Sequence, residues 1–300
     1  MSNGAGVTVH ARARDGATVA SRRWDARRPR GHALLLQGRG DFLDKDAAAA
    51  QRLVELGLTT LWWDWRGQGE SQNLGAPLGA GHVDSFEDYL ADLDAVLALH
   101  ADLPGPRVLV GHSMGGLVAA LHLLRRPSDA ASAVLVSPML GFRGTPPSPV
   151  VHAVARTATL LGRGRRWASG ERWTPPENCT LEANMATSDP DAFARMQTLR
   201  VGRPHGLVTG STWGWTAAAT GAMARLRRAD LSAVTTDVLI GSAPADPGVD
   251  PSAHHDLARR LPRGRVVEYP GRHDLLWESV ATTRALWHDI QQHVARTVAA

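Results

Sequence analysis

The chain has 300 residues and a formal net charge of +4, and Lys45 is its only lysine, so almost all of its positive charge comes from arginine. These arginines are scattered rather than interleaved with aromatic residues, which argues against a groove for nucleic acid. Cys179 is the only cysteine, which excludes an internal disulfide and a thiolate metal cluster. No stretch of 18 uninterrupted apolar residues occurs, and residues 1–14 lack the apolar segment of a secretory signal, so we expect a cytoplasmic protein.

Apolar strand-like segments and amphipathic helix-like segments alternate along the first part of the chain. Two alternating segments separated by Asp15-Gly16 predict a hairpin at the start. The near-continuous apolar strands that follow indicate an α/β fold, with a mostly parallel central sheet and helices on both faces. The expected strands are 7–14, 17–24, 32–37, 58–63, 107–110 and 133–136, and the expected helices are 44–56, 85–100 and 116–124.

This alternation is interrupted between residues 137 and 230, where prolines separate short helical pieces that are rich in tryptophan and arginine. It resumes with strands at 237–241 and 265–269, a helix at 252–261, and a last helix over 275–298. The sequence therefore predicts one α/β core made of residues 1–136 and 231–300, with residues 137–230 inserted as a helical cap.

The most informative motif is Gly-His-Ser-Met-Gly-Gly at residues 111–116, which directly follows an apolar strand. A strand, a turn too tight for β-carbons at Gly111 and Gly115, and a helix would together expose the hydroxyl of Ser113. The helix N-terminus beneath Ser113 would also stabilise an oxyanion formed when serine attacks a carbonyl. This context predicts a nucleophilic serine.

A serine nucleophile needs a base and a group that orients the base. His273 follows the expected strand 265–269, and Asp246 follows the strand 237–241, so both should emerge at the sheet edge where Ser113 emerges. Asp237 should lie at the opposite end of its strand. Asp250 fits the N-cap of the next helix better than the catalytic position. We therefore predict Ser113, Asp246 and His273 as the catalytic set.

The oxyanion formed by such a serine requires two backbone donors. The N–H of Met114, the residue after the nucleophile, is the first. The loop Gln37-Gly38-Arg39-Gly40 follows a predicted strand, and the N–H of Arg39 is the best second candidate. No metal-ligand motif, calcium loop or complete dinucleotide fingerprint occurs, so we expect neither a cofactor nor a metal.

These residues resemble the α/β-hydrolase superfamily, and within it the monoacylglycerol lipase and bacterial lysophospholipase branch, which is also described as serine aminopeptidase-like. The resemblance implies the same triad and the same two oxyanion donors. Many relatives begin the oxyanion loop with His-Gly, whereas this chain has Gln37-Gly38, a variant typical of the lysophospholipase-like members. The motifs that carry the resemblance are residues 36–39, 64–71, 81–89, 111–116 and 272–274.

The expected cap bears on the substrate. One helical face carries Val150, Val151, Val154, Ala158 and Leu161 and is followed by several arginines. Such a piece would either pack down on the core, which we favour, or make transient contact with a membrane surface and admit a lipid. Four tryptophans of this region would line an acyl pocket or form the cap's own core; they are Trp167, Trp173, Trp213 and Trp215.

The sequence thus predicts a serine hydrolase that cleaves carboxylic esters through an acyl-enzyme, with a lysophospholipid or a monoacylglycerol as substrate. Three alternatives use the same fold: a peptidase or amidase, an acyltransferase, and a non-catalytic binding module. The first two would use the same triad. The third would normally lack a member of the triad, and none is missing here.

Overall fold

A single twisted sheet with the strand order β1-β2-β4-β3-β5-β6-β7-β8 forms the centre of the protein. The computed structural model describes residues 7–73, 75–144, 148–203 and 206–298. β1 pairs antiparallel with β2 and β2 antiparallel with β4, while the remaining neighbours are parallel. The strands are β1 (Val9–Arg12), β2 (Thr18–Trp24), β3 (Gly31–Leu36), β4 (Leu58–Trp63), β5 (Arg107–His112), β6 (Ser132–Val136), β7 (Asp237–Ser242) and β8 (Gly264–Glu268).

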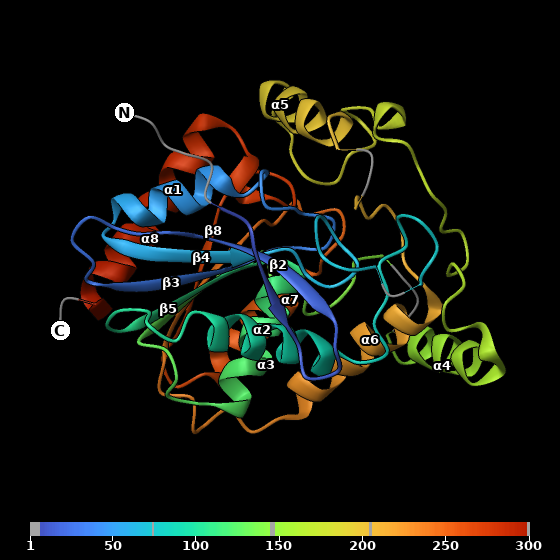
Figure 1. Ribbon diagram of the computed structural model, residues 1–300, viewed down its shortest axis with the longest axis horizontal. Helices are drawn as coiled ribbons and strands as arrows, with labels where there is room; N and C mark the ends of the chain where they lie inside the picture. Colours follow the sequence, from blue (N-terminus) through green and yellow to red (C-terminus); the bar gives the residue numbers. More distant parts are fainter. Residues whose placement is uncertain (1–6, 74, 145–147, 204–205, 299–300) are drawn as a thin grey trace.

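Alternate side chains of the central strands enter two separate apolar clusters. In β3, Leu34 and Leu36 pack with α2 (Phe86–Leu99), α3 (Met114–Arg125) and α7 (Pro251–Arg260). Ala33 and Leu35 of the same strand face α1 (Ala47–Glu55) and α8 (Val280–Val298) on the other side. Figure 1 shows α1 and α8 together on one face of the sheet and α2 and α3 on the other. The predicted mostly parallel sheet with helices on both faces is confirmed.

Two expected helices have different bounds. The helix expected at 44–56 begins only at Ala47, because residues 41–46 form turns around a buried group of charges described below. The helix expected at 275–298 is divided into a short turn, η3 (Leu275–Trp277), and α8. The reason for the break is Glu278, whose backbone is extended and whose carboxylate accepts hydrogen bonds from the N–H groups of Arg272 and Ser188.

The chain between β6 and β7 carries the helices expected of the cap. They are α4 (Ser148–Ala158), η1 (Thr159–Arg163), η2 (Pro176–Asn178), α5 (Pro190–Val201) and α6 (Trp213–Arg228). Figure 1 shows α4, α5 and α6 on the side of the sheet toward which the β4 arrow points. The division of the chain at residues 137 and 230 remains a prediction. No helix among the described residues combines the length and the apolar character needed to cross a bilayer.

The amphipathic helix α4 does not bury the face that we expected to pack on the core. Ala155 is fully buried and α4 packs along α6, where His152 bonds the Thr220 hydroxyl. Val150 and Val154, however, keep 53% and 52% of their surface exposed. The favoured packing of these two residues onto the core is therefore wrong, because α6 lies between much of α4 and the sheet.

Candidate active site

Ser113 occupies the turn between β5 and α3 in a strained backbone conformation. Its φ and ψ angles are 50° and −114°, which a residue with a β-carbon rarely adopts. The turn is so tight that a β-carbon at Gly111 would lie 2.7 Å from the Gly115 carbonyl oxygen, and one at Gly115 would collide with the Leu36 carbonyl oxygen. Glycine is therefore needed at both positions, and the turn directs the Ser113 hydroxyl toward the loops at the carboxyl edge of the sheet.

At this edge His273 lies within hydrogen-bonding distance of both Ser113 and Asp246. His273 Nε2 is 2.8 Å from Ser113 Oγ, and His273 Nδ1 is 2.6 Å from Asp246 Oδ2. The two competing carboxyl groups are elsewhere. Asp250 caps α7 by accepting a hydrogen bond from the Ser252 N–H, and Asp237 begins β7 at the other end of the strand. The structure thus brings together the three residues that the sequence predicted.

Asp246 is built to remain an anion. Its side chain is fully buried, and its Oδ1 atom accepts hydrogen bonds from the N–H groups of Gly248 (2.8 Å) and Val249 (2.9 Å). Burial alone would raise the pKa of this carboxyl, but the hydrogen bond and the charge interaction with His273, together with the two N–H donors, hold it below its usual value. Asp246 therefore presents negative charge to the imidazole ring.

The two predicted oxyanion donors lie on either side of the serine. Met114 is the first residue of α3, and the first N–H groups of a helix have no acceptor within it. In the loop after β3, the Gly38 N–H donates to Asp41 Oδ2 (2.8 Å) and the Gly40 N–H donates to Gln68 Oε1 (3.0 Å). Arg39 lies between these two bonded amides and borders both cavities that reach Ser113. Of these three amides, that of Arg39 alone bonds no acceptor among the described residues.

The Arg39 side chain joins the core to the cap, a role that sequence reasoning missed. Its Nη2 atom donates to the carbonyl oxygens of Ala80 (2.7 Å) and Gly210, and its guanidinium lies 4.1 Å from the centre of the Trp215 ring. Burial lowers the pKa of Arg39 to about 10. Stacking on an aromatic ring and bonding to carbonyl oxygens both suit a planar cation. Arg39 thereby fixes the loop that carries its own N–H.

Two cavities meet at Ser113 and His273. The larger has a volume of 690 Å³ and is mainly apolar, and Trp213 and Trp215 are the two of the four cap tryptophans that line it. Its other apolar side chains are Met139, Phe142, Val150, Val151, Val154, Met185 and Val249. The second cavity has a volume of 370 Å³ and a more polar wall, which includes Arg200 of α5. One site can therefore receive an apolar chain on one side of the serine and a polar group on the other.

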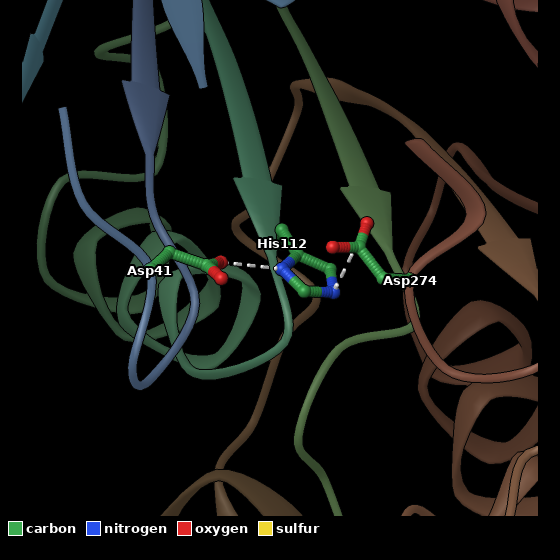
Figure 2. A group of neighbouring side chains, drawn as sticks. All are labelled: Asp41, His112 and Asp274. Atoms are coloured by element: carbon green, nitrogen blue, oxygen red, sulfur yellow. Dashed lines mark hydrogen bonds and ion pairs between the residues drawn. The ribbon is translucent and has the colours of Figure 1, made fainter. Parts of the chain in front are cut away.

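Behind the serine lies a buried cluster of charged residues that the sequence did not point to. His112, directly before Ser113, places its Nδ1 atom 2.9 Å from Asp41 Oδ2 and its Nε2 atom 3.8 Å from Asp274 Oδ1. Figure 2 shows the imidazole ring between the two carboxyl groups. The Lys45 ammonium contacts both of these carboxyl groups. The only available signal was the presence of a single lysine within Asp44-Lys45-Asp46.

Other charged residues near this edge are structural. Asp64 is fully buried and accepts hydrogen bonds from the N–H groups of Leu43 and Glu70, and burial raises its pKa to about 8. Arg66 forms a buried ion pair with Asp92 at 2.6 Å. Both residues are therefore occupied in holding the loop after β4.

A sequence model of the family described as "Serine aminopeptidase, S33" matches residues 27–280. The chain belongs to this family. The predicted membership of the α/β-hydrolase superfamily is thereby confirmed. The fold is similar to the crystal structure of a soluble variant of monoglyceride lipase from Saccharomyces cerevisiae. The match covers 99% of both chains, with a TM-score of 0.74 and 17% sequence identity.

Curated relatives of this serine aminopeptidase-like chain include lipid hydrolases. It is 32% identical over 187 residues to Lysophospholipase L2 of Escherichia coli K12, a match that covers 61% of this chain and 54% of that protein. It is 29% identical over 168 residues to a monoacylglycerol lipase of Mycolicibacterium smegmatis, with 55% of this chain and 54% of that protein covered. The chain thus spans about half the length of these two relatives.

Proposed function

We propose that the protein is a serine hydrolase that cleaves carboxylic esters of lipids through an acyl-enzyme. The observation that carries this proposal is the position of His273, which is within hydrogen-bonding distance of both Ser113 Oγ and the buried carboxylate of Asp246. In this arrangement the imidazole can take the proton of the serine hydroxyl, which makes the weakly nucleophilic oxygen reactive at neutral pH.

In the first half-reaction, Ser113 Oγ attacks the ester carbonyl while its proton moves to His273 Nε2. The negative charge of the tetrahedral intermediate lies on the former carbonyl oxygen, where the N–H groups of Met114 and Arg39 stabilise it. Asp246 stabilises the imidazolium. The carbon–oxygen bond to the alcohol then breaks, and His273 returns the proton to the departing alcohol oxygen. Water repeats the sequence on the acyl-enzyme and releases the fatty acid.

The two cavities suit the two halves of such a substrate, the acyl chain and the alcohol. The 690 Å³ cavity suits a fatty acyl chain because burying each methylene group contributes about 0.8 kcal/mol. The second cavity takes the alcohol side. Phe193, Met196 and Arg200 face it from α5, and the buried Nε atom of Arg200 has no hydrogen-bond partner among the described residues. A guanidinium in this position suits the phosphate of a lysophospholipid head group, which a monoacylglycerol lacks.

The outer surface of the cap supports transient contact with a membrane. Leu160 and Leu161 expose 77% and 71% of their surface and line neither cavity at Ser113, whereas Val150 and Val154 line the acyl cavity. Arg156 of α4 and Arg163 of η1 flank the two leucines, and a helix with exposed apolar and basic residues binds the interface of an anionic bilayer. This fits a cytoplasmic enzyme that is peripheral at the membrane and that draws single-chain lipids from it.

The alternatives differ in what they release. A peptidase or amidase would cleave an amide through the same three residues, and an acyltransferase would pass the acyl group to an alcohol in place of water. The test is a panel of lysophospholipids, monoacylglycerols and acyl amides, with and without an added alcohol acceptor, read by mass spectrometry. We expect free fatty acid from the esters and none from Ser113→Ala. Amide cleavage or transfer product as the main outcome would contradict ester hydrolysis.

A further inference from the structure

Lys45 is buried beside the candidate active site. It is the only lysine of the chain, and every other basic side chain apart from histidine is arginine. Its Nζ atom lies 2.7 Å from Asp41 Oδ1, 2.6 Å from Asp274 Oδ2 and 3.8 Å from Asp46 Oδ1. An ammonium is compact and has three donors, so it fits between two carboxyl groups where a guanidinium fork would not. Position 45 is therefore the one place in the sequence where the basic side chain is an ammonium and not a guanidinium or an imidazole.

Four segments form the proposed site, and the cluster around Lys45 connects three of them, leaving out the loop of Asp246. Asp41, on one side, also accepts the Gly38 N–H at 2.8 Å and contacts His112 at 2.9 Å. It therefore holds the loop that presents the Arg39 N–H. Asp274, on the other side, directly follows His273. The third segment is β5, because His112 precedes Ser113 and lies between the two carboxyl groups (Figure 2).

The charges of this cluster are mutually dependent. Burial alone would lower the pKa of Lys45, but Asp274, Asp41 and Asp46 raise it above its ordinary value. Burial would likewise lower the pKa of His112, but Asp274 and Asp41 raise it to about 9. Burial raises the pKa of Asp46 to about 7. Removing the ammonium would leave Asp41 and Asp274 facing each other with only His112 between them.

Asp41, His112 and Asp274 place three ligand atoms within 4.8 Å of one another, which is a spacing that would also suit a metal ion. The two carboxyl groups, however, already bind the Lys45 ammonium at 2.7 and 2.6 Å. The lysine thus brings the positive charge that a metal would otherwise supply.

We propose that Lys45 is a positioning residue that holds the oxyanion loop and the His273 loop in their reactive arrangement around Ser113. The proposal rests on the proposed function, because it concerns the same site. Although Lys45 borders the second cavity, its ammonium is bound by Asp41 and Asp274. It acts through Asp41 on the Arg39 N–H and through Asp274 on His273.

The test compares the wild type with Lys45→Met and with the double variant Lys45→Met/Asp274→Asn, using a p-nitrophenyl ester across a range of pH. For Lys45→Met we expect kcat to fall about 100-fold, as for the loss of one oxyanion donor, with KM changed less than about twofold. The loss of kcat should be larger at high pH, because His112, the cation that remains between Asp41 and Asp274, then loses its proton. The double variant removes one of the two facing charges and should recover at least about tenfold of the lost kcat.

A folded Lys45→Met protein with wild-type kcat at every pH, or a double variant with no recovery, would overturn the proposal. If Lys45→Met does not fold, the wild type labelled with ¹⁵N at its lysine Nζ replaces it. This lysine gives one side-chain NMR signal, which should exchange slowly with water and shift when a fluorophosphonate reacts with Ser113. A fast-exchanging signal, or one that the reaction leaves unmoved, would equally overturn it. Ester hydrolysis and labelling of the wild type test the proposed function separately.

Discussion

The Nδ1 atom of His273 lies 2.6 Å from Oδ2 of Asp246, and the side chain of Asp246 is fully buried. The carboxylate cannot turn toward water, since two backbone N–H groups bind its other oxygen. The imidazole is thereby fixed with Nε2 toward the serine, so the carboxylate orients the base of the proposed reaction.

Asp246→Asn should keep this geometry but lose the charge that stabilises the imidazolium. We expect kcat for a p-nitrophenyl ester to fall by about 10⁴, as when the orienting aspartate of a serine protease is replaced by asparagine. Asp250→Asn is the matched control, since it lies four residues away and caps α7, and asparagine caps a helix as well as aspartate does. Equal kcat values for the two variants would refute the assignment of Asp246.

The acyl cavity can be shortened from its cap side. Val151 is half-buried and lines the 690 Å³ cavity, so Val151→Trp would fill part of it. We expect kcat/KM for a 16-carbon ester to fall more than about tenfold while that for an acetyl ester stays unchanged, a loss of more than about 1.4 kcal/mol of transition-state binding. Leu160→Trp is the control because Leu160 is 77% exposed and outside this cavity. A uniform loss for all chain lengths would place the acyl chain elsewhere.

Arg200 should distinguish the two candidate lipid classes. Arg200→Gln removes the cation from the second cavity but keeps a shorter polar side chain that can still donate hydrogen bonds. We expect kcat/KM for a lysophospholipid to fall about tenfold or more, since a hydrogen bond to a charged group contributes roughly 1.5–3 kcal/mol. A monoacylglycerol with the same acyl chain is the internal control and should be unaffected. Parallel losses on both lipids would show that Arg200 does not bind phosphate.

The stability of the protein should depend on pH through His112. Although burial alone would lower the pKa of this imidazole, Asp274 and Asp41 raise it from 6.5 to about 9. Between these values the folded protein holds a proton that the unfolded chain has released, so the free energy of unfolding should fall as pH rises. Below pH 6.5 the contribution of His112 is fully present.

Urea unfolding of the wild type and of His112→Asn at pH values from 6 to 9 measures this contribution. Asp46, whose pKa burial raises to about 7 and His112 lowers, also titrates in this range, so the slope between pH 8 and 9 is the part that reports on His112. The variant should be less stable at pH 6 and should show a flatter pH dependence. The same slope in both proteins would mean that His112 does not titrate in this window.

The site residues could be predicted because each belongs to a local pattern at one edge of a parallel sheet. Gly111 and Gly115 mark the turn around Ser113, and strand-then-loop segments place Asp246 and His273 at the same edge. The order of strands along the chain therefore determines which side chains meet. Even Asp250 could be separated from Asp246, since the proline that follows it marks a helix start.

The remaining features depend on contacts between segments that carry no local signal. Lys45 and Asp274 are 229 residues apart, and nothing in the sequence around either residue indicates its partner. The late start of α1 and the break at Glu278 follow from similar long-range bonds. The exposure of Val154 depends on the position of α6. The apolar pattern of α4 does not predict that position.

The central claim is that Ser113 is the residue that becomes acylated. The most direct measurement is reaction of the folded wild type with a fluorophosphonate, followed by peptide mass mapping and an activity assay on the same sample. We expect one adduct per chain, located on Ser113, with esterase activity lost in proportion to labelling. An adduct on another residue that abolishes activity, or full ester hydrolysis by protein quantitatively modified at Ser113, would contradict it.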